Sequence, residues 1–169
     1  MQNKDNQSLK TRKSDHLDLA KKAQTLSDSI DSRFDFEPLF GTHPEDGRFG
    51  LETEFLGKKM KAPLWISSMT GGTKEAGELN RLWAQVASEF GLGLGLGSCR
   101  ILFDDPSRWS DFDLRPILGE ELPFYANLGV AQIESILEKS EVKKVEDLVG
   151  RLRADGLIIH INPLQESFQ

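Results

Sequence analysis

Some segments of the chain repeat apolar residues at helical spacing, and others alternate apolar and polar residues or form short apolar runs. These patterns predict helices and strands. Apolar residues at nearly helical spacing over 15–29 predict a helix, which Ser14 or Asp15 could cap. Residues 34–46 contain aromatic residues, Pro and Gly and predict a loop. Apolar and acidic positions alternate over 51–55, and a turn at Gly57 follows, so this region predicts a small β-ribbon of two strands.

From residue 63 onward, short apolar runs alternate with helical patterns. The runs predict strands over 63–67, 92–97, 123–126 and 156–159, and the helical patterns lie over 73–90, 106–118, 130–139 and 145–154. Thr73 is the expected cap of the first of these helices, and Gly91 is expected to end it. The residues expected on its inner face are Leu79, Leu82, Trp83, Val86 and Phe90.

Alternating strands and helices predict an α/β fold with parallel strands. The chain contains four strands, each followed by a helical pattern except the last. A complete (β/α)₈ barrel has eight such strand–helix units and needs roughly 250 residues. We therefore expect an N-terminal segment over 1–62 and the first half of a TIM barrel, truncated, over 63–169. A doubly wound sheet is the alternative, and it would explain how such a chain could stand alone.

Composition narrows the classes of partner. The 169 residues are 38% hydrophobic and 28% charged, and the net charge of −6 argues against a broad grip on nucleic acid. No apolar stretch approaches the roughly 18 residues of a spanning helix, and the polar start lacks a signal core, so a cytoplasmic protein is expected. Cys99 is the single cysteine, which leaves no disulfide framework and predicts a small side chain near a loop.

Small or hydrogen-bonding residues follow every barrel strand. They lie in 67–72, 97–100, 127–129 and 160–166. Because the carboxyl ends of barrel strands converge on one face, where active sites lie, these four segments predict a shared site.

Several of these residues have a second interpretation. Thr70-Gly71-Gly72 could let the backbone approach a flat ligand or could form a tight turn. The glycines alternating over 91–97 do not fit G-x-G-x-x-G and suggest tight packing against a strand. Arg100 could bind an anion or make a surface salt bridge.

The same holds at the two ends of the chain. Arg12-Lys13-x-x-His16 could clamp a phosphate or form a solvated basic segment. Glu166 could hold Mg²⁺ or interact with a helix dipole. His160 could line the site or be a satisfied core histidine, and Gln165 could position a group but is a poor acid or base.

Together these segments resemble the type 2 isopentenyl-diphosphate Δ-isomerase family. The matching pieces occur in family order from residue 12 to residue 166, and Met-Thr-Gly-Gly at 69–72 and His-x-Asn-Pro-Leu-Gln-Glu at 160–166 are the specific ones. The resemblance implies an FMN-bound (β/α)₈ barrel that interconverts isopentenyl and dimethylallyl diphosphate, with NADPH as reductant of the flavin and Mg²⁺ as metal. It also implies a homo-oligomer, a tetramer or octamer in full-length relatives.

The resemblance assigns a role to each matching residue. Ser68, Met69, Thr70, Gly71, Ser98 and Asn127 would contact FMN. Arg12, Lys13, His16, Arg100, His160 and Asn162 would bind the diphosphate or shape its pocket. Gln165 would lie over the reacting alkene, with Gln165 and His160 as the catalytic pair, and Glu166 would hold Mg²⁺.

Two departures and two alternatives accompany this prediction. Cys99 stands where the family has a larger residue, and the chain ends at Gln169, before the lysine and glycine-rich loops that hold the flavin. We therefore expect this chain alone to bind FMN weakly or not at all. The alternatives are a non-catalytic half-barrel and a related FMN-dependent 2-hydroxy acid oxidase.

Overall fold

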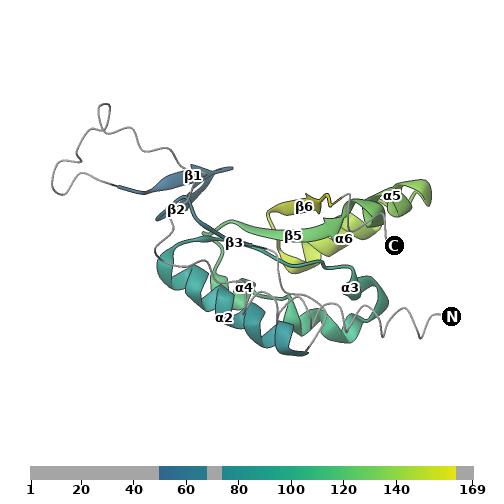
Figure 1. Cartoon of the computed structure of the whole chain (residues 1–169), viewed down its shortest axis with the longest axis horizontal. Helices are drawn as coiled ribbons and strands as arrows, with labels where there is room; N and C mark the ends of the chain where they lie inside the picture. The colour runs from purple at the N-terminus through teal and green to yellow at the C-terminus, as the bar shows by residue number, and fades with distance from the viewer. Residues whose placement is uncertain (1–49, 68–73, 163–169) are drawn as a thin grey trace, which may run out of the picture.

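The computed structural model describes residues 50–67 and 74–162. A two-stranded ribbon comes first, with β1 (Thr53–Phe55) antiparallel to β2 (Lys58–Met60). A four-stranded parallel sheet follows, with β3 (Trp65–Ser67), β4 (Gly93–Gly95), β5 (Phe124–Gly129) and β6 (Gly156–His160) (Figure 1). Both the ribbon and the four strands of the sheet were expected from the sequence, although β5 runs three residues beyond the predicted end at 126. The helix expected over 15–29 and the cap at Thr73 lie outside the described residues.

The helices connect the parallel strands. They are α2 (Lys74–Phe90), α3 (Ile101–Asp104), the 3₁₀ helix η1 (Pro106–Asp111), α4 (Arg115–Leu118), α5 (Val130–Glu138) and α6 (Lys143–Leu152). The single short helix expected within 106–118 is thus two short pieces, because Asp113 and Leu114 interrupt the helical turns before α4 begins at Arg115, with Pro116 in its first turn. None of the helices in the described part of the chain is long and apolar enough to cross a membrane.

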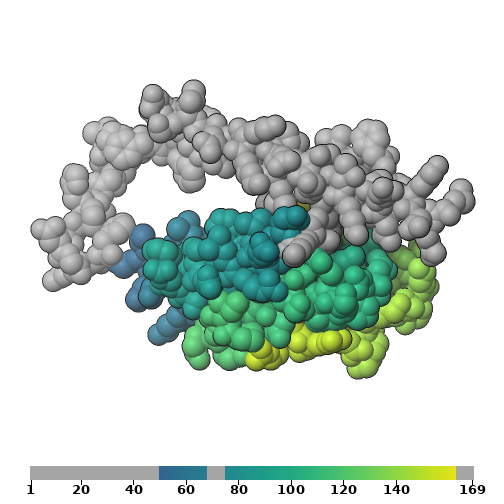
Figure 2. Space-filling model, turned by 90° about the horizontal axis from the view of Figure 1, so that it is seen from below, coloured from purple at the N-terminus to yellow at the C-terminus, as the bar shows by residue number. Residues whose placement is uncertain are grey.

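The strands lie in chain order, β3-β4-β5-β6, and their helices cover one face of the sheet. Phe124, Ala126 and Leu128 alternate along β5 and belong to one buried core, to which α2, α4, α5 and α6 also contribute. Seen from below, α2 lies against the segment that contains η1 and α4 (Figure 2). A doubly wound sheet would reverse its strand order and carry helices on both faces, so the described part is unlike that alternative.

Helix α2 packs through a different face from the predicted one. Its fully buried apolar residues are Ala76, Ala84 and Ala87, whereas Leu82, Trp83 and Phe90 are exposed. Small residues let the helix approach the sheet and its neighbours closely, and this close packing decides which face is buried. The prediction that the large apolar residues line the core is therefore wrong for these three, while Leu79 and Val86 are half-buried.

The opposite face of the sheet, called the helix-free face because none of the described helices lies on it, holds an aromatic cluster beside the ribbon. Phe55 of β1 makes edge contacts with Trp65 at 5.0 Å and Tyr125 at 5.9 Å, measured between ring centroids. Glycines make room for these rings, since a Cβ on Gly93 would lie 2.6 Å from the Trp65 indole and one on Gly156 would lie 2.8 Å from Tyr125. The glycines of this face therefore serve packing at one end of the sheet, as the alternating pattern indicated.

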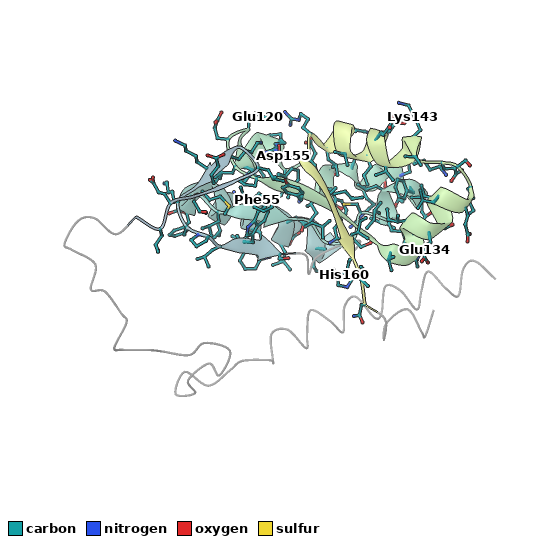
Figure 3. The ribbon with its side chains drawn as sticks, turned by 90° about the horizontal axis from the view of Figure 1, so that it is seen from above. Phe55, Glu120, Glu134, Lys143, Asp155 and His160 are labelled. Atoms are coloured by element: carbon teal, nitrogen blue, oxygen red, sulfur yellow. The ribbon has the colours of Figure 1, made fainter. Side chains whose placement is uncertain are left out.

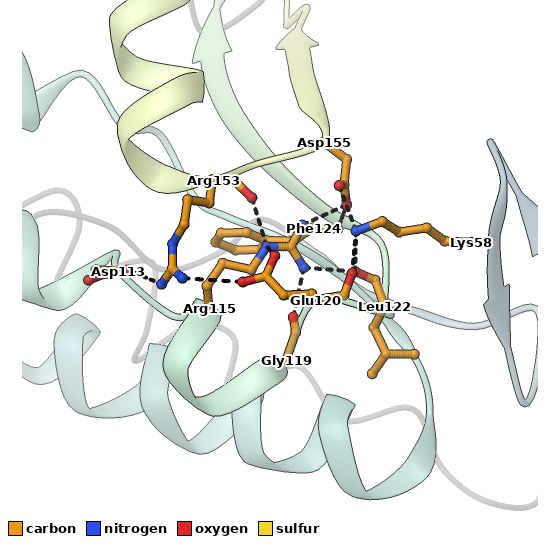
Figure 4. Close-up of polar contacts among 9 residues, drawn as sticks. All are labelled: Lys58, Asp113, Arg115, Gly119, Glu120, Leu122, Phe124, Arg153 and Asp155. Carbon is orange, nitrogen blue, oxygen red and sulfur yellow. Dashed lines mark hydrogen bonds and ion pairs between the residues drawn. The ribbon is translucent and has the colours of Figure 1, made fainter.

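A buried polar network ties the amino ends of the strands together (Figure 4). The fully buried Arg115 guanidinium donates to the Asp155 carboxylate at 2.8 Å and to the Arg153 carbonyl at 2.7 Å. The same carboxylate accepts the Phe124 N–H at 2.8 Å and pairs with Lys58 of the ribbon at 2.7 Å. Arg115 further donates to the carbonyls of Gly119 and Leu122. One arginine and one aspartate thus join α4, β5, β6 and the ribbon.

Candidate functional site at the carboxyl ends of the strands

Strand register places several predicted site residues on one face of the sheet. Asn127 of β5 lies opposite Ile158 of β6, and Gly129 lies opposite His160. Because paired residues of parallel strands point to the same side, Asn127 and His160 share a face. It is the helix-free face, since the neighbouring Ala126 and Leu128 point into the helical core.

The segment after β4 reaches the same end of the sheet. The Cys99 N–H donates to the Asn127 carbonyl at 2.8 Å, so Ser98 and Cys99 run alongside β5 beside Asn127. The Asn127 side chain is buried, Ser98 is half-buried, and Cys99 is fully buried with its thiol near the Gly97 carbonyl. The prediction of Cys99 as a small side chain near a loop is confirmed.

Two further predicted residues lie at the outer rim of this end. Arg100 directly precedes α3 and is exposed, and Asn162 is half-buried two residues beyond His160. His160 is itself exposed, so it is not a satisfied core histidine. Figure 3 shows His160 and Asp155 at opposite ends of β6, which separates the candidate site from the buried network.

The remaining predicted residues lie outside the described part of the chain. They are Arg12, Lys13, His16, Ser68, Met69, Thr70, Gly71, Gln165 and Glu166. Residues 50–67 and 74–162 contain no group of three or more His, Cys, Asp or Glu side chains placed to hold a metal. The proposed magnesium ligand thus remains a prediction from the sequence.

One side chain at this end was missed by the sequence analysis. Gln132, in the first turn of α5, folds back so that its Oε1 lies 2.4 Å from where a Cβ on Gly129 would be. Gly129 in turn lies opposite His160 across the β5–β6 pairing. A glutamine three residues after a strand-ending glycine is the signal that could have pointed to it, because first-turn side chains reach back to the helix start.

An open cleft lies at the other end of the strands. It has a volume of about 330 Å³ and is lined by residues that precede the strands, among them Lys61, Gly91 and Leu122. In α/β barrels, active sites lie at the carboxyl ends and the amino ends serve stability. The polar residues near Asn127, rather than this cleft, therefore form the candidate site.

Two groups with shifted pKa values lie at the amino ends of the strands, away from the candidate site. Burial alone would raise the pKa of Asp155, but hydrogen bonds from Lys58, the Phe124 N–H and Arg115 outweigh it and hold the pKa below 3.8. Burial, and then the charge of Asp155, raise the pKa of Tyr125 above 10.0. Asp155 therefore stays ionised and Tyr125 stays neutral near pH 7, so both keep one charge state while they stabilise the amino end of the sheet.

Comparison with known proteins gives this geometry a context. No protein-family model matches the chain. The isopentenyl-diphosphate delta-isomerase of Cronobacter sakazakii is 37% identical over 164 residues, which is 95% of this chain and 46% of the relative. The chain is similar to isopentenyl-diphosphate delta-isomerases.

Two further relatives carry the same name. The Deinococcus radiodurans protein is 36% identical over 95% of this chain and 47% of its own length. The Methanococcoides burtonii protein is 36% identical over 96% of this chain and 44% of its own length. The chain therefore spans about half the length of the curated relatives that it matches.

Proposed function

We propose that this chain carries one half of an enzyme that interconverts isopentenyl diphosphate and dimethylallyl diphosphate. The observation that supports this most is the similarity to three isomerases over nearly the whole chain. It includes the segments that bring hydrogen-bonding residues to the carboxyl ends of β4, β5 and β6. The relatives quoted are all named isomerases, and none is named an oxidase of 2-hydroxy acids.

We also propose that the described sheet is half of a (β/α)₈ barrel. Four parallel strands in chain order with helices on one face are what half of such a barrel would contain. The match to about half of each relative agrees with this interpretation, because the other half could hold the remaining strands.

The described residues fit a flat, hydrogen-bonding cofactor such as FMN. Gly95 and Gly97 share the helix-free face with Asn127, and they present no side chain that would block a ring. Ser98 and Asn127 would offer hydrogen-bonding groups to its edge. When bound and reduced by NADPH, the flavin would supply the proton-transfer chemistry that none of these side chains performs.

The reaction moves one double bond without net oxidation. A proton adds to the terminal methylene carbon C4, and another leaves the methylene carbon C2, so the double bond shifts from C3–C4 to C2–C3. Gln165 and His160 are the proposed catalytic pair. Gln165 would orient the alkene, and His160 would shape the pocket around it. Glu166 would bind Mg²⁺ at the diphosphate.

The remaining roles concern the diphosphate. Arg100 and Asn162 would bind it from the strand ends, and Arg12, Lys13 and His16 would bind it from the N-terminal segment. Arg100 is suited to this role because it is exposed at the rim, where its guanidinium can make two parallel hydrogen bonds to phosphate oxygens.

The test is an anaerobic assay with FMN, NADPH, Mg²⁺ and isopentenyl diphosphate. The chain is assayed alone and after co-expression with the part of the Deinococcus radiodurans relative that it does not match. Flavin-dependent formation of dimethylallyl diphosphate in either sample supports the proposal. Absence of product in both, while the intact relative is active, argues for the non-catalytic half-barrel.

A matched pair of variants tests the role of Arg100. Arg100→Ala should lower kcat/KM by roughly 10–100-fold, because a hydrogen bond to a charged group contributes about 1.5–3 kcal/mol. Lys59→Ala removes an exposed cation from the amino end of the sheet and should leave kcat/KM unchanged. Equal effects of the two substitutions would remove Arg100 from the substrate site.

A further inference from the structure

Gly129 leaves a gap in the row of side chains that faces the candidate site. It is the last residue of β5, two positions after Asn127, and it pairs with His160 of β6. Because successive residues of a strand point to opposite faces, a side chain at position 129 would lie on the same face as Asn127 and His160. Glycine leaves that place beside His160 open to another group.

The Gln132 carboxamide occupies this place from the first turn of α5. Its Oε1 lies 2.4 Å from the point where a Cβ on Gly129 would be, and its Cδ lies 3.4 Å from the same point. A side chain at position 129 would displace the carboxamide, so Gly129 is what lets Gln132 lie against the strand end. Gln132 is half-buried, in agreement with a side chain that folds back instead of extending into solvent.

Strand pairing places the carboxamide beside His160. Helix α5 contacts both β5 and β6, so it delivers Gln132 to the pair of strands that carries His160. Neighbouring strands are about 4.8 Å apart, and residues paired across them have adjacent side chains. A group in the place of the Gly129 side chain is therefore the neighbour of the His160 imidazole and within its hydrogen-bonding reach. The Gln132 NH₂ group is the part turned away from Gly129, with Nε2 3.9 Å from the Cβ position.

We propose that Gln132 is a positioning residue of the candidate site, where its NH₂ group donates a hydrogen bond to one nitrogen of the His160 imidazole. A neutral imidazole has one N–H donor and one acceptor nitrogen. The nitrogen that accepts from Gln132 cannot carry the proton, so the other nitrogen carries it and can donate to an anionic oxygen. This role deepens the proposed function and rests on it for the ligand, a diphosphate, whereas the side-chain arrangement does not depend on the reaction.

The test is the tautomer of His160, which NMR reads from the chemical shifts of its ring nitrogens in the 169-residue chain, at an alkaline pH where imidazole is neutral. The signals are assigned by their loss in His160→Asn. We expect one tautomer to predominate in the parent chain. Gln132→Leu removes the donor and should shift the ring nitrogens toward the averaged values of a free imidazole. Gln85→Leu is the matched control, because Gln85 is exposed on α2, which contacts β4, η1 and α4, and it should leave the His160 signals unchanged.

A second variant separates this role from a merely structural one. Gln132→Glu keeps the length of the side chain and places an acid in the first turn of α5, where it favours the helix. A role of Gln132 confined to helix stability would therefore leave the His160 tautomer as it is in the parent chain. A carboxylate only accepts, so under the proposal the ring nitrogen that faces it must carry the proton, and the tautomer should be reversed. Circular dichroism checks that both variants fold, and Gln132→Glu alone decides the question if Gln132→Leu does not fold.

Three outcomes would overturn the positioning role: ring nitrogens that are the same in the parent chain and Gln132→Leu, an equal change in Gln85→Leu, and the parent tautomer in Gln132→Glu. In the co-expressed complex of the isomerase assay, Gln132→Leu should raise KM for isopentenyl diphosphate roughly 10-fold with kcat little changed, because it weakens a hydrogen bond to a group that does not react. An unchanged KM would overturn the role at the substrate. A reversed tautomer in Gln132→Glu without any isomerase activity would leave the positioning role intact and refute the proposed function, whereas activity with an unchanged tautomer would do the opposite.

Discussion

Asp155 offers the sharpest test of what holds this fold together. Its carboxylate accepts hydrogen bonds from the buried Arg115 guanidinium and from the Phe124 N–H, and it pairs with Lys58. Asp155→Asn keeps one acceptor oxygen but replaces the other with an NH₂ group and removes the charge opposite Arg115. At least one of the three donors then loses its acceptor.

The expected cost follows from burial. Breaking a fully buried ion pair costs about 3–5 kcal/mol, and a hydrogen bond to a charged group contributes about 1.5–3 kcal/mol. The Arg115 side chain is fully buried, but the Asp155 side chain is 24% exposed, so water can partly compensate for the loss. We therefore expect Asp155→Asn to lower the free energy of unfolding by about 2–3 kcal/mol.

Asp113→Asn is the matched control. Asp113 pairs with Arg153 at 3.4 Å, with both side chains about half exposed, and such surface pairs contribute roughly 0–1 kcal/mol. Urea unfolding of the two variants and the parent chain, at pH 7 and one protein concentration, gives the comparison. Equal losses in the two variants, or a loss below about 1 kcal/mol for Asp155→Asn, would refute the reasoning.

The pH dependence provides a second check. The folded pKa of Asp155 lies below its ordinary value of 3.8, so its contribution to stability is fully present above the unfolded pKa. It is lost as the pH falls through the folded pKa, because the carboxylate is then protonated in both states. The stability difference between the parent chain and Asp155→Asn should therefore shrink as the pH falls below about 4. A difference that grows with acid would have the wrong sign.

Two further predictions concern the aromatic cluster and its surroundings. Gly93→Ala should lower the free energy of unfolding in urea by about 1–3 kcal/mol, because the new Cβ would lie 2.6 Å from the Trp65 ring. Gly150→Ala, in α6 with open space around it, should raise that free energy by about 0.5–1 kcal/mol. Similar effects of the two substitutions would contradict this reasoning. Tyr125 is the single tyrosine, so the absorbance of tyrosinate during a pH titration should report its pKa, which we expect above 10.0. Asp155→Asn should lower this pKa, because it removes a nearby negative charge. A titration midpoint at or below 10.0 in the folded parent chain would contradict the prediction.

The strands were predictable because each is a short apolar run bounded by glycine or proline. The pattern at 123–126 and 156–159 located β5 and β6, and the polar residues after them lie at the ends of the strands, as expected. Pattern alone could not reveal the buried face of α2. Both its small residues and its large apolar residues fall on one broad apolar stripe, and only packing against η1 and α4 decides which half is covered.

The buried network lay beyond what the sequence could indicate. Arg115 and Asp155 are 40 residues apart, and a charged residue is ordinarily assigned to the surface. Asn127 and His160, in contrast, were found because both end strands that alternate with helices, and such ends converge in space. Gln132 was missed because it contacts this end of the sheet from within a helix rather than from a strand end.

The most direct measurement is the isomerase reaction in D₂O, followed by NMR, with the chain co-expressed with the unmatched part of the Cronobacter sakazakii relative. We expect dimethylallyl diphosphate that carries deuterium in the methyl group formed from the terminal methylene. Flavin and Mg²⁺ should be required, and the rate should be lower in Arg100→Ala. A folded, flavin-loaded complex that gives no deuterated product, while the intact relative does so under the same conditions, would contradict the account.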